Sequence, residues 1–74
     1  MNIKQVVGDN IRFIREKRGI TQEDLAIIAK MSKTFIGDIE RAQKAPTTVS
    51  LAKIARALKI DPSILLIPNA YKTI

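Results

Sequence analysis

A short segment near the middle of the chain carries hydrogen-bonding side chains on one face. Ile36 and Ile39 lie three residues apart, which places both on one apolar face of a helix. Helical geometry then sets the opposite face, which holds Lys33, Thr34, Gly37 and Asp38, with Phe35 at one flank. Lysine donates hydrogen bonds, threonine donates and accepts them, and aspartate accepts them. Such a face is suited to recognition through hydrogen bonds and charge.

The composition argues against catalysis. The 74 residues include no Cys and no His, so neither a nucleophile–base pair nor a metal-binding set stands out. The aspartates at positions 9, 24, 38 and 61 are dispersed along the chain, and three of them have better local roles. We therefore expect no enzymatic activity, no cofactor and no metal site.

The charge balance points to a polyanionic partner. Lys and Arg number 13 against 7 Asp and Glu, a net charge of +6, which favours nucleic acid first and an anionic membrane second. The basic residues are not gathered on one long amphipathic helix, and no apolar run approaches the roughly 20 residues of a membrane span. The lack of Cys and of a signal peptide fits the cytoplasm. We expect a cytoplasmic protein without membrane association.

Two short helices joined by a tight turn must hold this polar face in place. Leu25 and Ala29 are four residues apart and share one face of the first helix, which runs from Gln22 to about Ala29. The turn has only three residues, so the helices must cross at a steep angle, with Ala26 as the small residue at the crossing. This is the geometry of a helix-turn-helix, whose second helix can enter a DNA major groove.

The rest of the chain supplies three more helices. A stripe of Ile3, Val7, Ile11 and Ile14 predicts a helix over residues 3–18, with Gly19 at its C-cap. Caps are predicted at Thr21, Ser32, Thr47 or Thr48, and Asp61. The fourth helix presents Leu51, Ile54, Ala55 and Leu58, and a short fifth helix spans Pro62–Leu66. The sequence therefore predicts a five-helix, all-α domain over residues 1–68 and a tail over 69–74 without regular structure.

These features together resemble the lambda repressor and Cro family of helix-turn-helix regulators, also called the XRE family. The resemblance covers about residues 8–66 and is carried by IRFIREKRGITQEDLA, FIGDIER and SLAKIARALKIDPSIL. Lys30 and Ala42 depart from the family, which usually has Gly at the first position and often at the second. A left-handed Lys30 would cost on the order of 1 kcal/mol. The resemblance implies a bacterial or phage-encoded regulator that binds double-stranded DNA sequence-specifically, as a dimeric repressor on a palindromic operator.

The resemblance also assigns the polar face to base contacts, at Lys33, Thr34, Gly37 and Asp38. Lys33 can donate to guanine or, equally, to a phosphate, and Thr34 can use its hydroxyl or touch a thymine methyl. Asp38 can accept from cytosine N4 or, alternatively, pair with Arg41 or Lys33. Gly37 is expected to permit close approach, while Phe35 either touches DNA or packs beside Met31.

Contacts to the DNA backbone are predicted around the same unit. By resemblance, Gln22 at the start of the first helix binds a phosphate, where the helix N-terminus attracts anions. Ser32, Arg41 and Lys44 are further phosphate candidates, against the alternative that they are capping or solvated groups. The resemblance also implies a structural ion pair between Arg15 and Glu40, which keeps Glu40 out of the base-reading set.

Apolar residues outside the expected core suggest partners. One or two residues of the run 64–67 must cover the core, and the remainder, assigned to Ile64, Leu66 and Ile67, could form a two-fold dimer patch. One of Ile27 and Ile28 is expected to close the core against the fourth helix and the other to be exposed.

Two alternatives to a repressor stay open. The first is a protein-interaction module, such as an antitoxin, that docks a protein through Ile28 or the 64–67 run. The second is a restriction-modification controller that also activates transcription. Activation would need an acidic contact to RNA polymerase, for which Glu23 and Asp24 are the only candidate pair.

Overall fold

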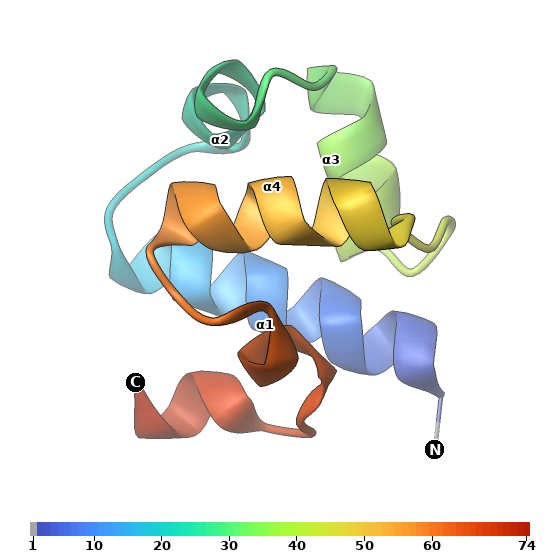
Figure 1. Ribbon diagram of the computed structural model, residues 1–74, viewed down its shortest axis with the longest axis vertical. Helices are drawn as coiled ribbons and strands as arrows, with labels where there is room; N and C mark the ends of the chain where they lie inside the picture. The colour runs from blue at the N-terminus through green and yellow to red at the C-terminus, as the bar shows by residue number, and fades with distance from the viewer. Residues whose placement is uncertain (1) are drawn as a thin grey trace.

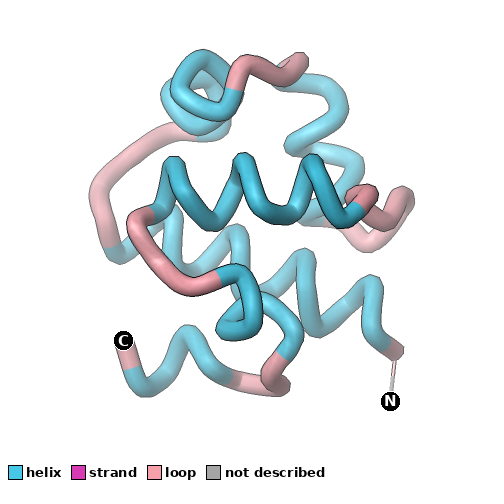
Figure 2. Tube along the Cα trace, viewed as in Figure 1, coloured by secondary structure: helices cyan, strands magenta, loops and turns pink. Residues whose placement is uncertain are grey.

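The computed structural model describes residues 2–74, whose regular elements are helices joined by short loops (Figure 1). The elements are α1 (Ile3–Lys17), α2 (Gln22–Ala29), α3 (Lys33–Glu40), α4 (Thr48–Leu58), and the 3-10 helices η1 (Pro62–Leu66) and η2 (Ala70–Thr73). Residues 2–74 contain no strand (Figure 2), and none of their helices is long and apolar enough to cross a bilayer. The all-α prediction is confirmed, but the described residues form four α-helices rather than five, because the short segment after Asp61 winds with the tighter 3-10 geometry.

Side-chain caps fix where the helices begin. Thr21 and Asp24 form a reciprocal capping box at α2, and Ser32 accepts a hydrogen bond from the Phe35 N–H at α3. Thr47, rather than Thr48, caps α4, and Asp61 caps η1. Each cap satisfies a backbone N–H that has no partner inside its helix.

The turns that follow α2 and α3 use left-handed residues other than glycine. Lys30, which ends α2, has φ 57° and ψ 49°, and Ala42, just after α3, has φ 61°. These are the two positions where the family usually or often has Gly, so the chain keeps the turn geometry while accepting a cost of about 1 kcal/mol at each. The Lys30 conformation lets the Met31 N–H donate to the Ala26 carbonyl at 2.9 Å, which closes the turn into α3.

The core lies between α1, α4 and the α2–α3 unit. In Figure 1, α4 crosses the front, α1 runs behind and below it, and α2 and α3 lie above. The fully buried residues include Ile11, Leu25, Ile36, Ile54 and Leu65. The prediction that one isoleucine of α2 closes the core is wrong, because both are exposed, Ile27 by 69% and Ile28 by 55%.

A glycine allows α1 to approach α3 closely. A Cβ added to Gly8 would lie 2.6 Å from the Ile39 carbonyl oxygen and 2.9 Å from that of Glu40. No side chain fits there, so the backbone of α1 lies directly against the end of α3. This contact fixes the depth at which α3 sits on the domain.

The C-terminal tail is ordered, contrary to prediction. The amide nitrogen of the fully buried Asn10 donates to the carbonyls of Leu65 (3.1 Å) and Ile67 (2.9 Å), while its oxygen accepts from the Tyr71 N–H (3.1 Å). The Tyr71 ring packs on Phe13, with 4.6 Å between centroids. One polar side chain of α1 therefore holds both η1 and η2 in place.

Candidate nucleic-acid interface

The α2–α3 unit presents a rigid outer face. Ala26 is 4% exposed at the predicted crossing point, and Ile36 and Ile39 on the inner face of α3 are 0% and 1% exposed. Lys33, Thr34 and Ser32 are exposed at the start of α3. Phe35 and Met31 are half-buried and pack against the core, which is the packing alternative for Phe35. The helical periodicity therefore predicted the inner face of α3 correctly.

A network of three side chains, two of them buried, locks α3 to α1 and α2. The Arg15 Nε lies 2.7 Å from Glu40 Oε2, and its Nη2 lies 3.1 Å from Oε1, so the expected ion pair is present and bidentate. Arg15 Nη1 donates to the Ile20 carbonyl at 2.8 Å, and Gln22 Nε2 donates to Glu40 Oε1 at 3.0 Å. The hydrogen bond to Glu40 raises the pKa of Arg15, so the guanidinium stays charged. Glu40 is therefore a structural residue.

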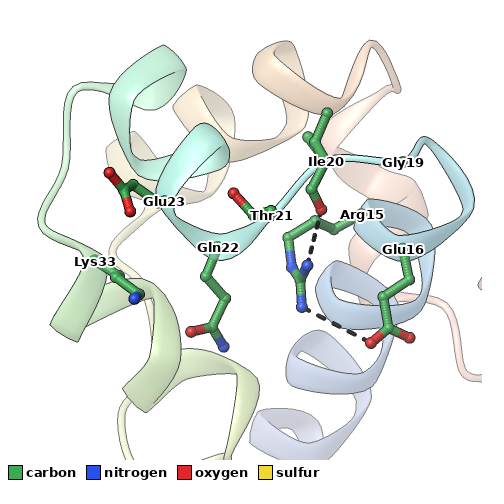
Figure 3. Close-up of a pocket in the computed structure, with 8 residues that line it drawn as sticks. All are labelled: Arg15, Glu16, Gly19, Ile20, Thr21, Gln22, Glu23 and Lys33. Atoms are coloured by element: carbon green, nitrogen blue, oxygen red, sulfur yellow. Dashed lines mark hydrogen bonds and ion pairs between the residues drawn. The ribbon is translucent and has the colours of Figure 1, made fainter.

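The network places Gln22 beside the start of α3. Gln22 and Lys33 line one open groove together with Arg15 and Thr21, and Figure 3 shows their side chains in this groove, where Arg15 bonds to the Ile20 carbonyl. Gln22 uses one of its two amide hydrogens on Glu40, which leaves the other free to donate. Within residues 2–74, Lys33 forms no ion pair. The two side chains can therefore both donate toward one anionic surface.

The second half of α3 differs from the expected open face. Asp38 is paired with two cations, since its Oδ1 lies 2.8 Å from Arg41 Nη2 and its Oδ2 lies 3.6 Å from Lys44 Nζ. Gly37 is buried, because the Arg41 guanidinium lies over it. Of the alternatives for Asp38, the structure shows the pair with Arg41 and not one with Lys33.

Only part of the predicted dimer patch is exposed to solvent. Leu66 and Ile67 are 45% and 51% exposed, whereas Ile64 is half-buried against the core. Leu65 is fully buried and supplies the core contact of η1. The exposed part of the run is therefore the adjacent pair 66–67.

The sequence did not predict a basic groove that lies between the C-terminal halves of α2 and α4. Ile28 and Ala57 form its apolar part, and its cations are Lys30, Lys53, Arg56 and Lys59. No carboxylate lines this groove. Its cations are spread between positions 30 and 59, so no local run of charges in the sequence indicates that they form one surface.

Comparison with known proteins matches this architecture to one family. A helix-turn-helix family model matches residues 11–65. The control protein C.SmaI of Serratia marcescens is 33% identical, covering 97% of this chain and 86% of that protein. The control protein C.BamHI of Bacillus amyloliquefaciens is 36% identical, with 88% and 82% covered. The crystal structure of the restriction-modification controller protein C.AhdI from Aeromonas hydrophila superposes with a TM-score of 0.81 at 32% identity, covering 84% of this chain and 94% of that one. The chain belongs to the XRE-type helix-turn-helix family of DNA-binding transcriptional regulators.

Proposed function

We propose that the chain is a homodimeric repressor that binds a two-fold symmetric operator by inserting α3 into the major groove. The observation that carries the proposal is the polar start of α3, held in a fixed position by the buried Arg15–Glu40 pair beside the α2 N-terminus. A recognition helix contacts bases mainly through residues near its own N-terminus. Lys33 and Thr34 occupy that place and are exposed.

Backbone contacts in this proposal surround the reading residues. Gln22 donates its free amide hydrogen to a phosphate at the α2 N-terminus, where the helix dipole favours an anion. The Ser32 hydroxyl, which accepts from the Phe35 N–H, keeps its own hydrogen for a second phosphate. Lys44 follows α3 and adds a third contact, with a positive charge exposed to solvent.

Dimerisation is proposed through Leu66 and Ile67, with the half-buried Ile64 at the edge of the patch. Two-fold association there buries adjacent apolar side chains that a monomer leaves in water. The two copies of α3 would then lie about one DNA turn apart, roughly 34 Å. Sedimentation of the wild type and of Ile67→Glu tests this: the variant should be monomeric, and an unchanged mass would reject the patch.

Selection of bound duplexes from a random pool tests the proposed function. The expected result is one enriched sequence with two-fold symmetry. Lys and Arg side chains displace counterions from DNA, so affinity should fall steeply between 50 and 200 mM salt, by about a thousandfold for a dimer that neutralises six phosphates. Failure to enrich any sequence, or binding that salt does not weaken, would contradict the proposal.

A contact to RNA polymerase, if this regulator also activates, is proposed through Glu23 alone. The Asp24 carboxylate accepts from the Thr21 N–H at 3.0 Å and is committed to the capping box, whereas Glu23 is exposed. In a promoter–reporter assay, Glu23→Lys should abolish activation and keep operator binding. Retained activation would rule this contact out.

The basic groove favours a second candidate function, the docking of an acidic protein segment. Ile28 offers an apolar anchor, and the four surrounding cations have no carboxylate facing them. Ile28 and Ala57 line the groove beside the cations, so it can bury an apolar side chain of a peptide, which a bare phosphate does not have.

Titration of the isotopically labelled chain with a synthetic Leu- and Glu-rich peptide tests the docking candidate. NMR shifts are expected at Ile28 and Ala57, and Ile28→Asp should abolish them. Ile27→Asp is the matched control, because Ile27 is equally apolar and more exposed but does not line the groove. Shifts confined to α3, or equal losses in both variants, would contradict docking here.

A further inference from the structure

The side chain of Arg41 lies back along the outer face of α3 instead of extending from its end. A Cβ added to Gly37 would lie 2.9 Å from Arg41 Nη1 and 3.5 Å from Nη2, so the guanidinium covers this glycine. Asp38 holds it there through the 2.8 Å bond from Nη2 to Oδ1. Long side chains on helices point toward the N-terminus, which is the direction of Lys33 and Thr34.

We propose that Arg41 reads a guanine in the operator and that Asp38 is the residue that positions it. The proposal deepens the function proposed above and rests on α3 entering the major groove. It exchanges the roles that the sequence suggested, in which Asp38 contacts a base and Arg41 a phosphate.

The geometry of the pair suits guanine recognition. The planar guanidinium carries five N–H groups, and its pairing with Asp38 uses only one of them. Two of the others can donate to the O6 and N7 of one guanine, the commonest specific contact in the major groove. The Arg41 side chain is 60% exposed, so these groups are open to solvent in the free protein. Because Asp38 already holds the guanidinium in place, Arg41 loses less side-chain conformational entropy when DNA binds.

The same contacts make Asp38 a poor base reader. One of its oxygens faces Arg41 and the other faces Lys44. Two cations therefore neutralise the carboxylate, which lets it sit near DNA phosphates without strong repulsion. Its side chain is 19% exposed, against 60% for each of its cations. The carboxylate is thus held below the surface that its partners present.

Gly37 is required because any side chain at this position would displace the guanidinium. Arg41 is flexible, so the Cβ of Gly37→Ala would push it aside without disturbing the backbone. Alanine also has a higher helix propensity than glycine. Gly37→Ala should therefore keep or raise the stability of the fold while displacing the Arg41 guanidinium. The variant thus separates an effect on base recognition from an effect on stability.

The experiment measures binding of wild-type protein and variants to its selected duplex and to duplexes with each base pair changed singly. Wild type should discriminate against substitution of one guanine per half-site by about 5- to 150-fold. Arg41→Lys keeps the charge but replaces the planar fork with a single ammonium group, so it should reduce discrimination at that guanine alone. Gly37→Ala and Asp38→Asn should weaken discrimination at the same position, with melting temperatures showing that the chain is folded.

Different outcomes separate this proposal from the proposed function. Equal weakening on every duplex, with Arg41→Lys keeping the wild-type base preference, would make Arg41 a phosphate contact and overturn the inference. A lost preference for cytosine in Asp38→Asn, with the Arg41 position unchanged, would make Asp38 the reader and also overturn it. A random pool from which wild type enriches nothing would overturn both the inference and the proposed function. Lys44→Ala provides the comparison, because loss of a phosphate contact should weaken all duplexes alike.

Discussion

The substitution Glu40→Gln removes one charge from an ion pair that is buried on both sides. The Glu40 and Arg15 side chains are 3% and 10% exposed. The glutamine keeps the size of the glutamate but leaves the Arg15 guanidinium without a counter-ion. Breaking a buried pair in this way costs about 3 to 5 kcal/mol, because the remaining charge stays desolvated.

This loss is large relative to the stability of so short a chain. At about 0.05 to 0.15 kcal/mol per residue, 74 residues have a free energy of unfolding of about 4 to 11 kcal/mol. A loss of 3 kcal/mol lowers the melting temperature by at least about 12 °C. Thermal and urea unfolding followed by circular dichroism should show this shift for Glu40→Gln.

A double-mutant cycle isolates the pair itself. Arg15→Met combined with Glu40→Gln leaves no unpaired charge, so the double variant should be more stable than the sum of the single losses by about 1.5 to 3 kcal/mol. The matched control is the exposed pair of Arg12 and Glu16, 3.6 Å apart, whose coupling should stay below about 0.5 kcal/mol. A coupling for the buried pair no larger than for the exposed pair would refute its role as the lock on α3.

Three further predictions concern the fold. Asn10→Asp replaces a donor amide with a carboxylate facing the carbonyls of η1, so it should lower the free energy of unfolding by at least about 2 kcal/mol. It should also change the fluorescence emission of Tyr71, the only tyrosine, and wild-type stability would contradict this prediction. Ala42→Gly relieves the left-handed strain and should raise the melting temperature by about 4 to 8 °C in calorimetry, and a decrease would contradict it. Hydrogen bonds from the backbone of Thr21 and Ser63 lower the pKa values of Asp24 and Asp61 below 3.8. The two carboxylates therefore contribute fully to the free energy of unfolding above that pH, and this contribution is lost as the pH falls through the lowered pKa values. Unfolding of Asp24→Asn/Asp61→Asn should accordingly depend less on pH below about 4, and an unchanged acid dependence would contradict it.

The helices were predictable because local signals agree. The capping box at Thr21 and Asp24, the pair Asp61-Pro62 and the spacing of Ile36 and Ile39 each act within a few residues, and the structure contains all three. The outward face of Lys33 and Thr34 follows from the same periodicity.

Features that depend on distant contacts were not predictable. Asn10 is a polar residue that does not belong to the apolar stripe predicted for α1, and its partners lie more than 50 residues further along the chain. The adjacent Ile27 and Ile28 could not be placed by spacing, and both are exposed because Leu25, Ala26 and Ala29 already form the inner face of α2. The position of Arg41 over Gly37 depends on one side-chain conformation, which periodicity does not determine.

The central claim is that the exposed start of α3 reads DNA, and Lys33→Glu tests it most directly. The measurement is the affinity of this variant for the selected duplex and for an unrelated duplex, alongside its melting curve. Lys72→Glu, on η2, carries the same charge change and serves as the control. We expect Lys33→Glu to bind the two duplexes equally weakly with an almost unchanged melting curve, while Lys72→Glu keeps its preference for the selected duplex. A Lys33→Glu variant that still prefers the selected duplex as wild type does would contradict the account.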